Sequence, residues 1–221
     1  MSQVRSTTTE AVLRAAAEVF MDKGYQSATI RDIACAAGIS KPTVYQYAES
    51  KQWLLETIVR RVCDELDASA QLVYGADAPP DIRFYWLIWV NVDLAIRYRT
   101  FYRVTLSEQA DLSAQAREEF RKWAHMKTSN VRDLLLECDE QGTLTWQGDV
   151  TVAANLILSM LSSVHRWFRP GEPVTTEGLT DDISKLLASA VRPPADLGSW
   201  PRPAWENVER DQTRGAVTAD N

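Results

Sequence analysis

Four hydrogen-bonding side chains, Lys41, Thr43, Gln46 and Tyr47, fall within one short stretch in the first quarter of the chain. On a helix they lie close enough together to form one exposed face. An ammonium, two hydroxyls and an amide can all hydrogen-bond to base edges, and the amide of Gln46 can contact one base in bidentate fashion. Because the DNA major groove admits one α-helix, the pattern predicts a helix that contacts DNA through this face.

Two short helices joined by a tight turn, over residues 30–37 and 41–47, are predicted to position this face. Thr29 is a hydroxyl N-cap, placed directly before apolar residues at the i, i+3, i+4, i+7 spacing of one helix face. Gly38 ends the first helix, since glycine readily adopts the left-handed conformation of a C-terminal turn. Ser40 caps the second helix, which is too short to be stable without packing against its neighbours. The pattern is that of a helix-turn-helix.

This stretch resembles the DNA-binding domain of the TetR (tetracycline-repressor-like) family of transcriptional regulators. The resemblance covers about the first 60 residues and is carried by Thr29, Ile30, Ile33, Ala34, Ala37, Gly38, Ile39, Ser40, Val44, Tyr45, Ser50, Lys51, Leu54 and Leu55. Within the motif we expect phosphate contacts from Thr29, Tyr45 and Lys51. We expect base-edge contacts from Lys41, Thr43, Gln46 and Tyr47.

The composition is that of a globular protein, with 45% hydrophobic and 24% charged residues. No run approaches the ~20 apolar residues of a membrane span, and no signal peptide is evident, so we expect a cytoplasmic protein with no membrane partner. The net charge is −6, but residues 1–60 hold seven Lys and Arg against six Asp and Glu, so the acidity lies outside the predicted DNA-binding region. Cys35, Cys63 and Cys138 lack metal-ligand spacing, and we expect reduced thiols, no metal and no cofactor.

Helical periodicity without strand-like alternation predicts an all-α fold. We expect a helix-turn-helix domain over 1–50, a larger helical effector-binding and dimerisation domain over 51–192, and a tail without stable structure over 193–221. The helix over 51–72 connects the two domains. The other helices are expected at about 8–22, 82–98, 100–109, 113–141, 149–168 and 176–191.

Aromatic residues are concentrated in the second region. They are either the ordinary filling of a helical core or the wall of a cavity between helices, where bundles bind ligands. A flat apolar wall with a few polar groups suits an apolar or amphipathic small molecule. The residues expected to line such a cavity are Trp86, Trp89, Tyr98, Phe101, Tyr102, Trp123, Met126 and Asn155.

The last two predicted helices carry apolar residues on more than one face. One face packs on the chain's own core, and another is expected to meet a second copy across a two-fold axis, the symmetry that two recognition helices need for two half-sites. The residues expected at this contact are Val164, Trp167, Phe168, Ile183, Leu186 and Leu187. The TetR resemblance implies the same homodimer and a ligand cavity in the middle of the effector domain.

The resulting expectation is a ligand-responsive regulator of transcription that binds double-stranded DNA. Repression is the family default, with release from a palindromic operator by a hydrophobic or amphipathic effector. Residues 164–173 resemble a segment of family members linked to lipid or steroid catabolism, whose ligands are acyl-CoA thioesters. The alternative is an architectural or nucleoid-associated dimer without an effector. An enzyme is not expected, because the two histidines lack evident partners and no catalytic motif is present.

Overall fold

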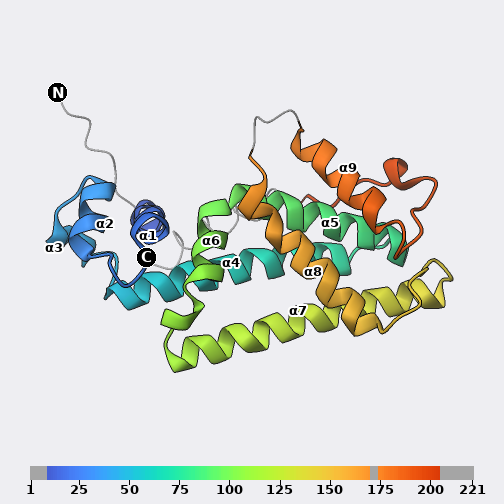
Figure 1. The fold of residues 1–221 in the computed structure, drawn as a ribbon. Helices are drawn as coiled ribbons and strands as arrows, with labels where there is room; N and C mark the ends of the chain where they lie inside the picture. The colour runs from blue at the N-terminus through green and yellow to red at the C-terminus, as the bar shows by residue number, and fades with distance from the viewer. Residues whose placement is uncertain (1–8, 170–173, 205–221) are drawn as a thin grey trace, which may run out of the picture. The chain divides into compact units, whose positions relative to one another are not determined.

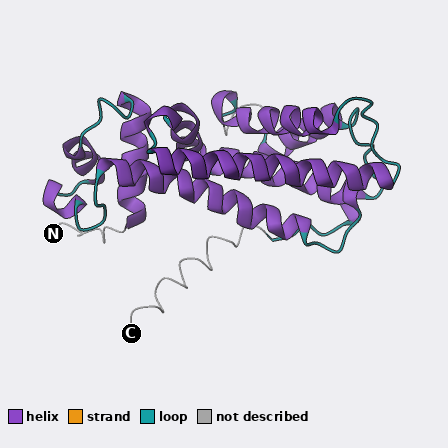
Figure 2. Cartoon of the chain, turned by 90° about the horizontal axis from the view of Figure 1, so that it is seen from below, coloured by secondary structure: helices purple, strands orange, loops and turns teal. Residues whose placement is uncertain are grey.

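Helices make up all the regular structure in the part of the chain that the computed structural model describes, residues 9–169 and 174–204 (Figures 1 and 2). The predicted all-α class is confirmed. The elements in chain order are α1 (Thr9–Lys23), α2 (Ile30–Ala37), α3 (Lys41–Val44), α4 (Lys51–Tyr74), α5 (Pro80–Arg97), α6 (Arg99–Ser107), η1 (Gln109–Asp111), α7 (Ala114–Glu140), α8 (Val150–Trp167), α9 (Thr176–Leu187) and η2 (Leu197–Ser199). No described helix is long and apolar enough to cross a membrane.

The chain divides into two compact units that differ from the expected division. Unit 1 contains residues up to Cys63 together with 98–122, and unit 2 contains 64–97 together with the residues from Trp123 onward. Residues 98–122 were expected in the second domain. In the structure α6 packs against α1, so this segment clusters with the N-terminal helices.

The core of unit 1 is formed by the apolar stripes of its helices. Phe20 of α1, Ile33 of α2 and Val44 of α3 are fully buried. The ring of Phe20 meets that of Tyr25 edge to face, with the ring centroids 5.3 Å apart. Aromatic pairs prefer this geometry because the positive ring edge approaches the negative face. The apolar stripe of α1, which includes Val12, Leu13 and Phe20, is therefore the face that packs.

Unit 2 is built around α5, which contacts both α8 and α9 (Figure 1). The sequence of this helix is apolar nearly all round, and buried residues occur along its whole length. The hydroxyl of Tyr85, itself 1% exposed, donates a hydrogen bond of 2.8 Å to the carbonyl of Val191. Burial raises the pKa of Tyr85 to about 12, so the hydroxyl stays protonated as this donor requires.

The segment after α9 is more ordered than the sequence suggested. The last helix ends at Leu187 rather than at 191, because the following backbone bonds to the turn after α7: the N–H groups of Thr145 and Trp146 both donate to the carbonyl of Ala190. Arg192 donates its N–H to Thr143 (2.8 Å), and the chain then forms η2. Residues 192–204 thus have defined structure where a disordered tail was expected, and the remainder of that predicted tail, 205–221, lies outside the described residues.

Candidate DNA-binding and effector sites

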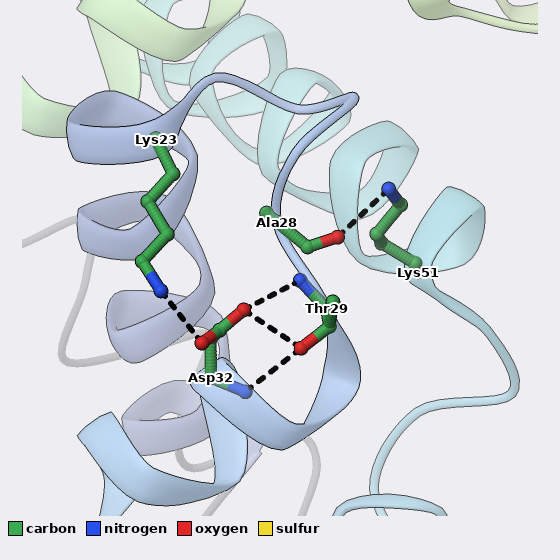
Figure 3. Close-up of polar contacts among 5 residues, drawn as sticks. All are labelled: Lys23, Ala28, Thr29, Asp32 and Lys51. Carbon is green, nitrogen blue, oxygen red and sulfur yellow. Dashed lines mark hydrogen bonds and ion pairs between the residues drawn. The ribbon is translucent and has the colours of Figure 1, made fainter.

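The first helix of the motif, α2, begins at a complete capping box (Figure 3). The Thr29 hydroxyl accepts from the N–H of Asp32 (3.2 Å), while the Asp32 carboxylate accepts from the Thr29 N–H (3.0 Å) and hydroxyl (2.7 Å). Lys23 of α1 adds an ion pair to the other carboxylate oxygen at 2.6 Å. The hydrogen bond from Lys23, followed by those from Thr29, lowers the pKa of Asp32 to about 2. This box fixes the start of α2 against the end of α1.

The turn between the two helices has the predicted geometry. Gly38 is left-handed, with φ of 69°, and Ile39 donates its N–H to the carbonyl of Ala34 (3.0 Å). These bonds satisfy carbonyls that the end of a helix leaves open. Ser40 then caps α3 by accepting from the N–H of Thr43 (3.3 Å). The two hydroxyls of Ser40 and Thr43 also bond to each other at 2.7 Å.

The α-helical part of the recognition element is shorter than expected. It ends at Val44, and residues 45–47 form a turn. Lys41, Gln46 and Tyr45 are exposed, whereas Thr43 and Tyr47 are partly buried. Within the described part of the chain, no hydrogen bond from the side chains of Lys41, Tyr45 or Gln46 is found, so these three are the groups most available to DNA.

Lys51 is held inside unit 1 by backbone carbonyls. Its ammonium donates to Tyr25 (2.7 Å), Ala28 (2.9 Å) and Gln26 (3.3 Å), and lies 4.3 Å from the centroid of the Tyr25 ring (Figure 3 draws the bond to Ala28). Three carbonyls account for the three N–H groups of an ammonium. The phosphate contact expected from Lys51 stays a prediction, and it would require this arrangement to open.

A second anchoring network links the N-terminal helices to the loop between α6 and α7. The Tyr25 hydroxyl donates to Gln52 (2.7 Å), and Gln52 donates to the carbonyl of Asp111 (3.0 Å) and to Glu56 (2.9 Å). Glu56 in turn accepts from the N–H of Ser113 (3.2 Å). Sequence reasoning missed this network, since nothing local in the sequence pairs residues separated by about 60 positions.

The eight residues expected to line an effector cavity fall into two groups. Tyr98, Phe101 and Tyr102 belong to unit 1, where all three are buried, and the other five belong to unit 2. Burial raises the pKa of Tyr102, whose hydroxyl therefore remains neutral.

Within unit 2 the expected residues differ in exposure. Trp86 is 4% exposed, but Met126 is 46% exposed, and Asn155 lies at the surface with its amide donating to Thr151 on its own helix (2.8 Å). One face of the Trp89 ring is covered by the guanidinium of Arg202. The structure thus brings Met126 and Asn155 to the surface rather than to the interior.

A polar cluster within unit 2 joins α4, α5 and α7. The Trp123 indole donates to Asp67 (2.9 Å), and Lys127 donates to the side-chain oxygen of Asn91 (2.9 Å) while its ammonium lies 5.4 Å from the Trp123 ring centroid. Burial raises the pKa of the Asp67 carboxyl despite the indole bond. Of these residues only Trp123 was among the expected ligand contacts.

The last two long helices form an apolar groove of about 690 Å³. Its lining includes five of the six residues expected at a dimer contact: Val164, Trp167, Phe168, Ile183 and Leu186. The sixth, Leu187, is buried. Trp167 and Leu186 are 58% and 64% exposed, which is unusual for large apolar side chains that lie so close together. Part of the segment compared above with acyl-CoA-responsive regulators, residues 170–173, lies outside the described residues.

The fold and the site define a helical DNA-binding regulator with an N-terminal helix-turn-helix. Residues 12–58 match the family described as bacterial regulatory proteins, tetR family, and residues 77–191 match the tetracyclin repressor-like C-terminal domain. The chain belongs to the TetR family of transcriptional regulators, and it is not an enzyme.

Relatives of known function support this assignment. The transcriptional repressor KstR2 of Mycobacterium tuberculosis is 26% identical over 190 residues, covering 86% of this chain and 94% of KstR2. The transcriptional activator FasR of Mycolicibacterium smegmatis is 46% identical over 170 residues, covering 77% and 76% of the two chains. The crystal structure of AibR in complex with isovaleryl coenzyme A and operator DNA has the same fold, with a TM-score of 0.72 at 24% identity over 82% of this chain and 98% of AibR.

The capping box makes the start of α2 sensitive to acid. The folded-state pKa of Asp32 is about 2, below its ordinary value of 3.8, so the carboxylate stabilises the fold above about pH 4 and this contribution is lost as the pH falls toward 2. We expect wild type to be more stable than Asp32→Asn at pH 6 and the difference to shrink to nothing near pH 2. Urea unfolding at a series of pH values measures this. A difference that is independent of pH would contradict the assignment.

Two lysine substitutions separate anchoring from DNA contact. Lys51→Met removes a charged donor from three carbonyls, and we expect a loss of about 1.5–3 kcal/mol in stability, the range for hydrogen bonds to charged groups. Lys41→Met, on an exposed side chain, should leave stability unchanged and lower DNA affinity. Thermal unfolding and DNA titration of both variants test this. If Lys51→Met lost DNA affinity at wild-type stability, Lys51 would be a phosphate contact instead.

Proposed function

We propose that this regulator is a homodimeric repressor that binds a palindromic operator and is released by an amphipathic small molecule of the acyl-CoA thioester class. The observation that carries the proposal is the exposed set Lys41, Tyr45 and Gln46 on a capped helix-turn-helix. A cation, a phenol and an amide supply contacts to both phosphates and base edges.

Base recognition depends chiefly on Gln46 in this proposal. Its amide presents a donor and an acceptor, which match the N7 and N6 groups of adenine in the major groove. Thr43 is less available than expected, because its hydroxyl bonds to Ser40 within the cap. The 49% exposure of Tyr45 supports a phosphate contact from its hydroxyl in this proposal.

Dimerisation through α8 and α9 is supported by the exposed apolar groove. Trp167 and Leu186 project from different helices into the same groove, and Leu156 and Val152 extend the exposed apolar stripe along α8 at helical spacing. A two-fold axis at this surface would let the face of one copy bury that of the other. A two-fold dimer also explains why a palindrome is the expected operator.

The effector class is supported by the relatives and by the polar cluster of unit 2. AibR binds isovaleryl coenzyme A, and KstR2 and AibR share this fold. In this chain Lys127 provides a cation beside the indole of Trp123, while the Asn91 amide is already bonded, its oxygen to Lys127 and its N–H to the Leu87 carbonyl. The Lys127 ammonium suits the polar carbonyl end of an acyl chain whose remainder lies against apolar side chains.

Release from DNA would be a shift between two populations of the dimer. An effector that binds the form with mismatched recognition helices lowers operator affinity, by no more than its preference for that form. Couplings of this kind are typically about 1–3 kcal/mol, which corresponds to roughly 5- to 150-fold in affinity.

Selection of bound DNA from a random library, with and without acyl-CoA compounds, tests the proposed function. We expect a palindromic site whose enrichment falls when acyl-CoA of suitable chain length is added. Repeating the selection with Gln46→Ala should relax one base pair in each half-site, a loss of about 1–3 kcal/mol in discrimination. A palindrome that responds to no compound would favour the architectural dimer, and no enriched site would overturn the reading of α3.

A charge placed in the groove should prevent dimerisation. Leu186 is 64% exposed, so Leu186→Glu should leave the single chain folded, whereas a pair of unpaired carboxylates buried at a two-fold contact is strongly unfavourable. We expect a largely monomeric protein with weak operator binding, measured by sedimentation equilibrium. Leu136→Glu, at a 42% exposed leucine of α7, is the matched control and should remain dimeric. A dimeric Leu186→Glu variant would place the interface elsewhere.

A further inference from the structure

The segment that follows α9 is tied to unit 2 at its beginning and again near its described end. At its beginning Val191 pairs with Leu144 and accepts the Tyr85 hydroxyl bond, and Arg192 donates its N–H to Thr143. Eleven residues after Val191, the guanidinium carbon of Arg202 lies 3.5 Å from the centroid of the Trp89 ring. The segment therefore leaves α5 beside Tyr85 and returns to the same helix at Trp89, one turn further along.

Arg202 lies at a hollow between α5 and α9. A hollow of about 300 Å³ is lined by Trp89 and Asp93 of α5, by Thr176 and Glu177 of α9, and by the tail itself. Asp93 forms an ion pair with Arg97 one turn further along α5. The indole face attracts cations through its quadrupole, and the Glu177 carboxylate adds negative potential at the hollow, whereas Arg97 offsets the charge of Asp93.

The chemistry of this surface favours a guanidinium over an ammonium. A guanidinium is planar and weakly hydrated, so it stacks on an indole while its N–H groups remain directed at neighbouring carboxylates. The sequence around Arg202 also restricts the backbone, since Arg202 lies between Pro201 and Pro203. Each proline fixes its own φ, which lowers the entropy lost when the segment is ordered.

We propose that Trp89, Asp93 and Glu177 form a guanidinium-binding site between α5 and α9, and that Arg202 of the chain's own tail is its occupant. The tail then acts as a latch that bridges the two helices. It also covers the ring face of Trp89, which the sequence suggested for an effector, so a ligand reaches that face only when the latch opens. This inference does not depend on the proposed operator or effector.

The latch is weak enough to open reversibly. Arg202 is exposed, and a cation–π contact at an exposed site shifts an opening equilibrium by about two- to fivefold. The segment between the two anchor points contains η2, where Ser199 donates its N–H to Asp196 (2.8 Å). The exchange rate of such amides reports the population of the open tail.

Amide hydrogen exchange on the full-length chain, without DNA or effector, tests the latch. We expect Arg202→Ala to speed exchange at Leu197–Trp200 by about two- to fivefold, and Arg202→Lys to have an intermediate effect because it keeps charge but loses planar stacking. Arg192→Ala is the matched control, since it removes an exposed arginine from the same tail while keeping the backbone bond to Thr143. It should exchange as wild type does.

A double-mutant comparison checks that Trp89 is the partner of Arg202. If the two side chains act through one contact, Trp89→Leu combined with Arg202→Ala should exchange no faster than the more affected single variant. Unchanged exchange in Arg202→Ala would overturn the proposal. Effects of the two substitutions that multiply would also overturn it, because the residues would then act independently.

Discussion

The shortness of α3 is the constraint on which the DNA-binding unit depends. A helix of four residues makes too few internal hydrogen bonds to form by itself, so its position comes from its surroundings. Val44 buries its inner side completely, and Ser40 satisfies its first open N–H group. The outer face is thereby left for DNA. Any group that fixes α2 or the start of α4 also fixes this face.

Lys51 and the capping box illustrate how that support is distributed. The box ties α2 to α1 through Lys23, and Lys51 ties the loop before α2 to the start of α4. The Tyr25 carbonyl also accepts from the Ala28 N–H (3.3 Å), but removing Lys51 from the carbonyls of Gln26 and Ala28 would cost free energy in proportion to their burial. A residue that belongs to a DNA-binding motif can therefore stabilise the fold without touching DNA.

The sequence predicted the features that depend on near neighbours. Thr29, Gly38 and Ser40 act within four residues of their own positions, so cap and turn chemistry was enough to place them. The apolar residues on nearly every side of α5 indicate a buried helix for the same reason. The end of α9 was misplaced because the residues that follow it bond to residues 143–146, through the Ala190 carbonyl and the Arg192 N–H, and no local pattern reveals this partner.

The sequence alone could not place the candidate ligand-binding residues relative to one another, because long-range packing decides where each side chain lies. Residue type shows that the side chains of Trp89 and Met126 are apolar, but it does not show which residues each side chain contacts. Met126 is exposed and Trp89 is stacked by a residue more than 100 positions away. The number of aromatic residues therefore correctly indicated a buried helical region. It did not indicate which of these aromatic side chains lie next to one another.

The assignment of residues 98–122 to unit 1 bears on how an effector acts. The loop after α6 bonds to Gln52 and Glu56 near the start of α4, and α4 continues to Asp67, which bonds Trp123 of α7. Both α4 and α7 thus supply residues to both units by covalent continuity. Under the proposed function, an effector in unit 2 that prefers one arrangement of either helix would change the stability of the network that supports α3. Because linkage is reciprocal, operator DNA would then change effector affinity by the same factor.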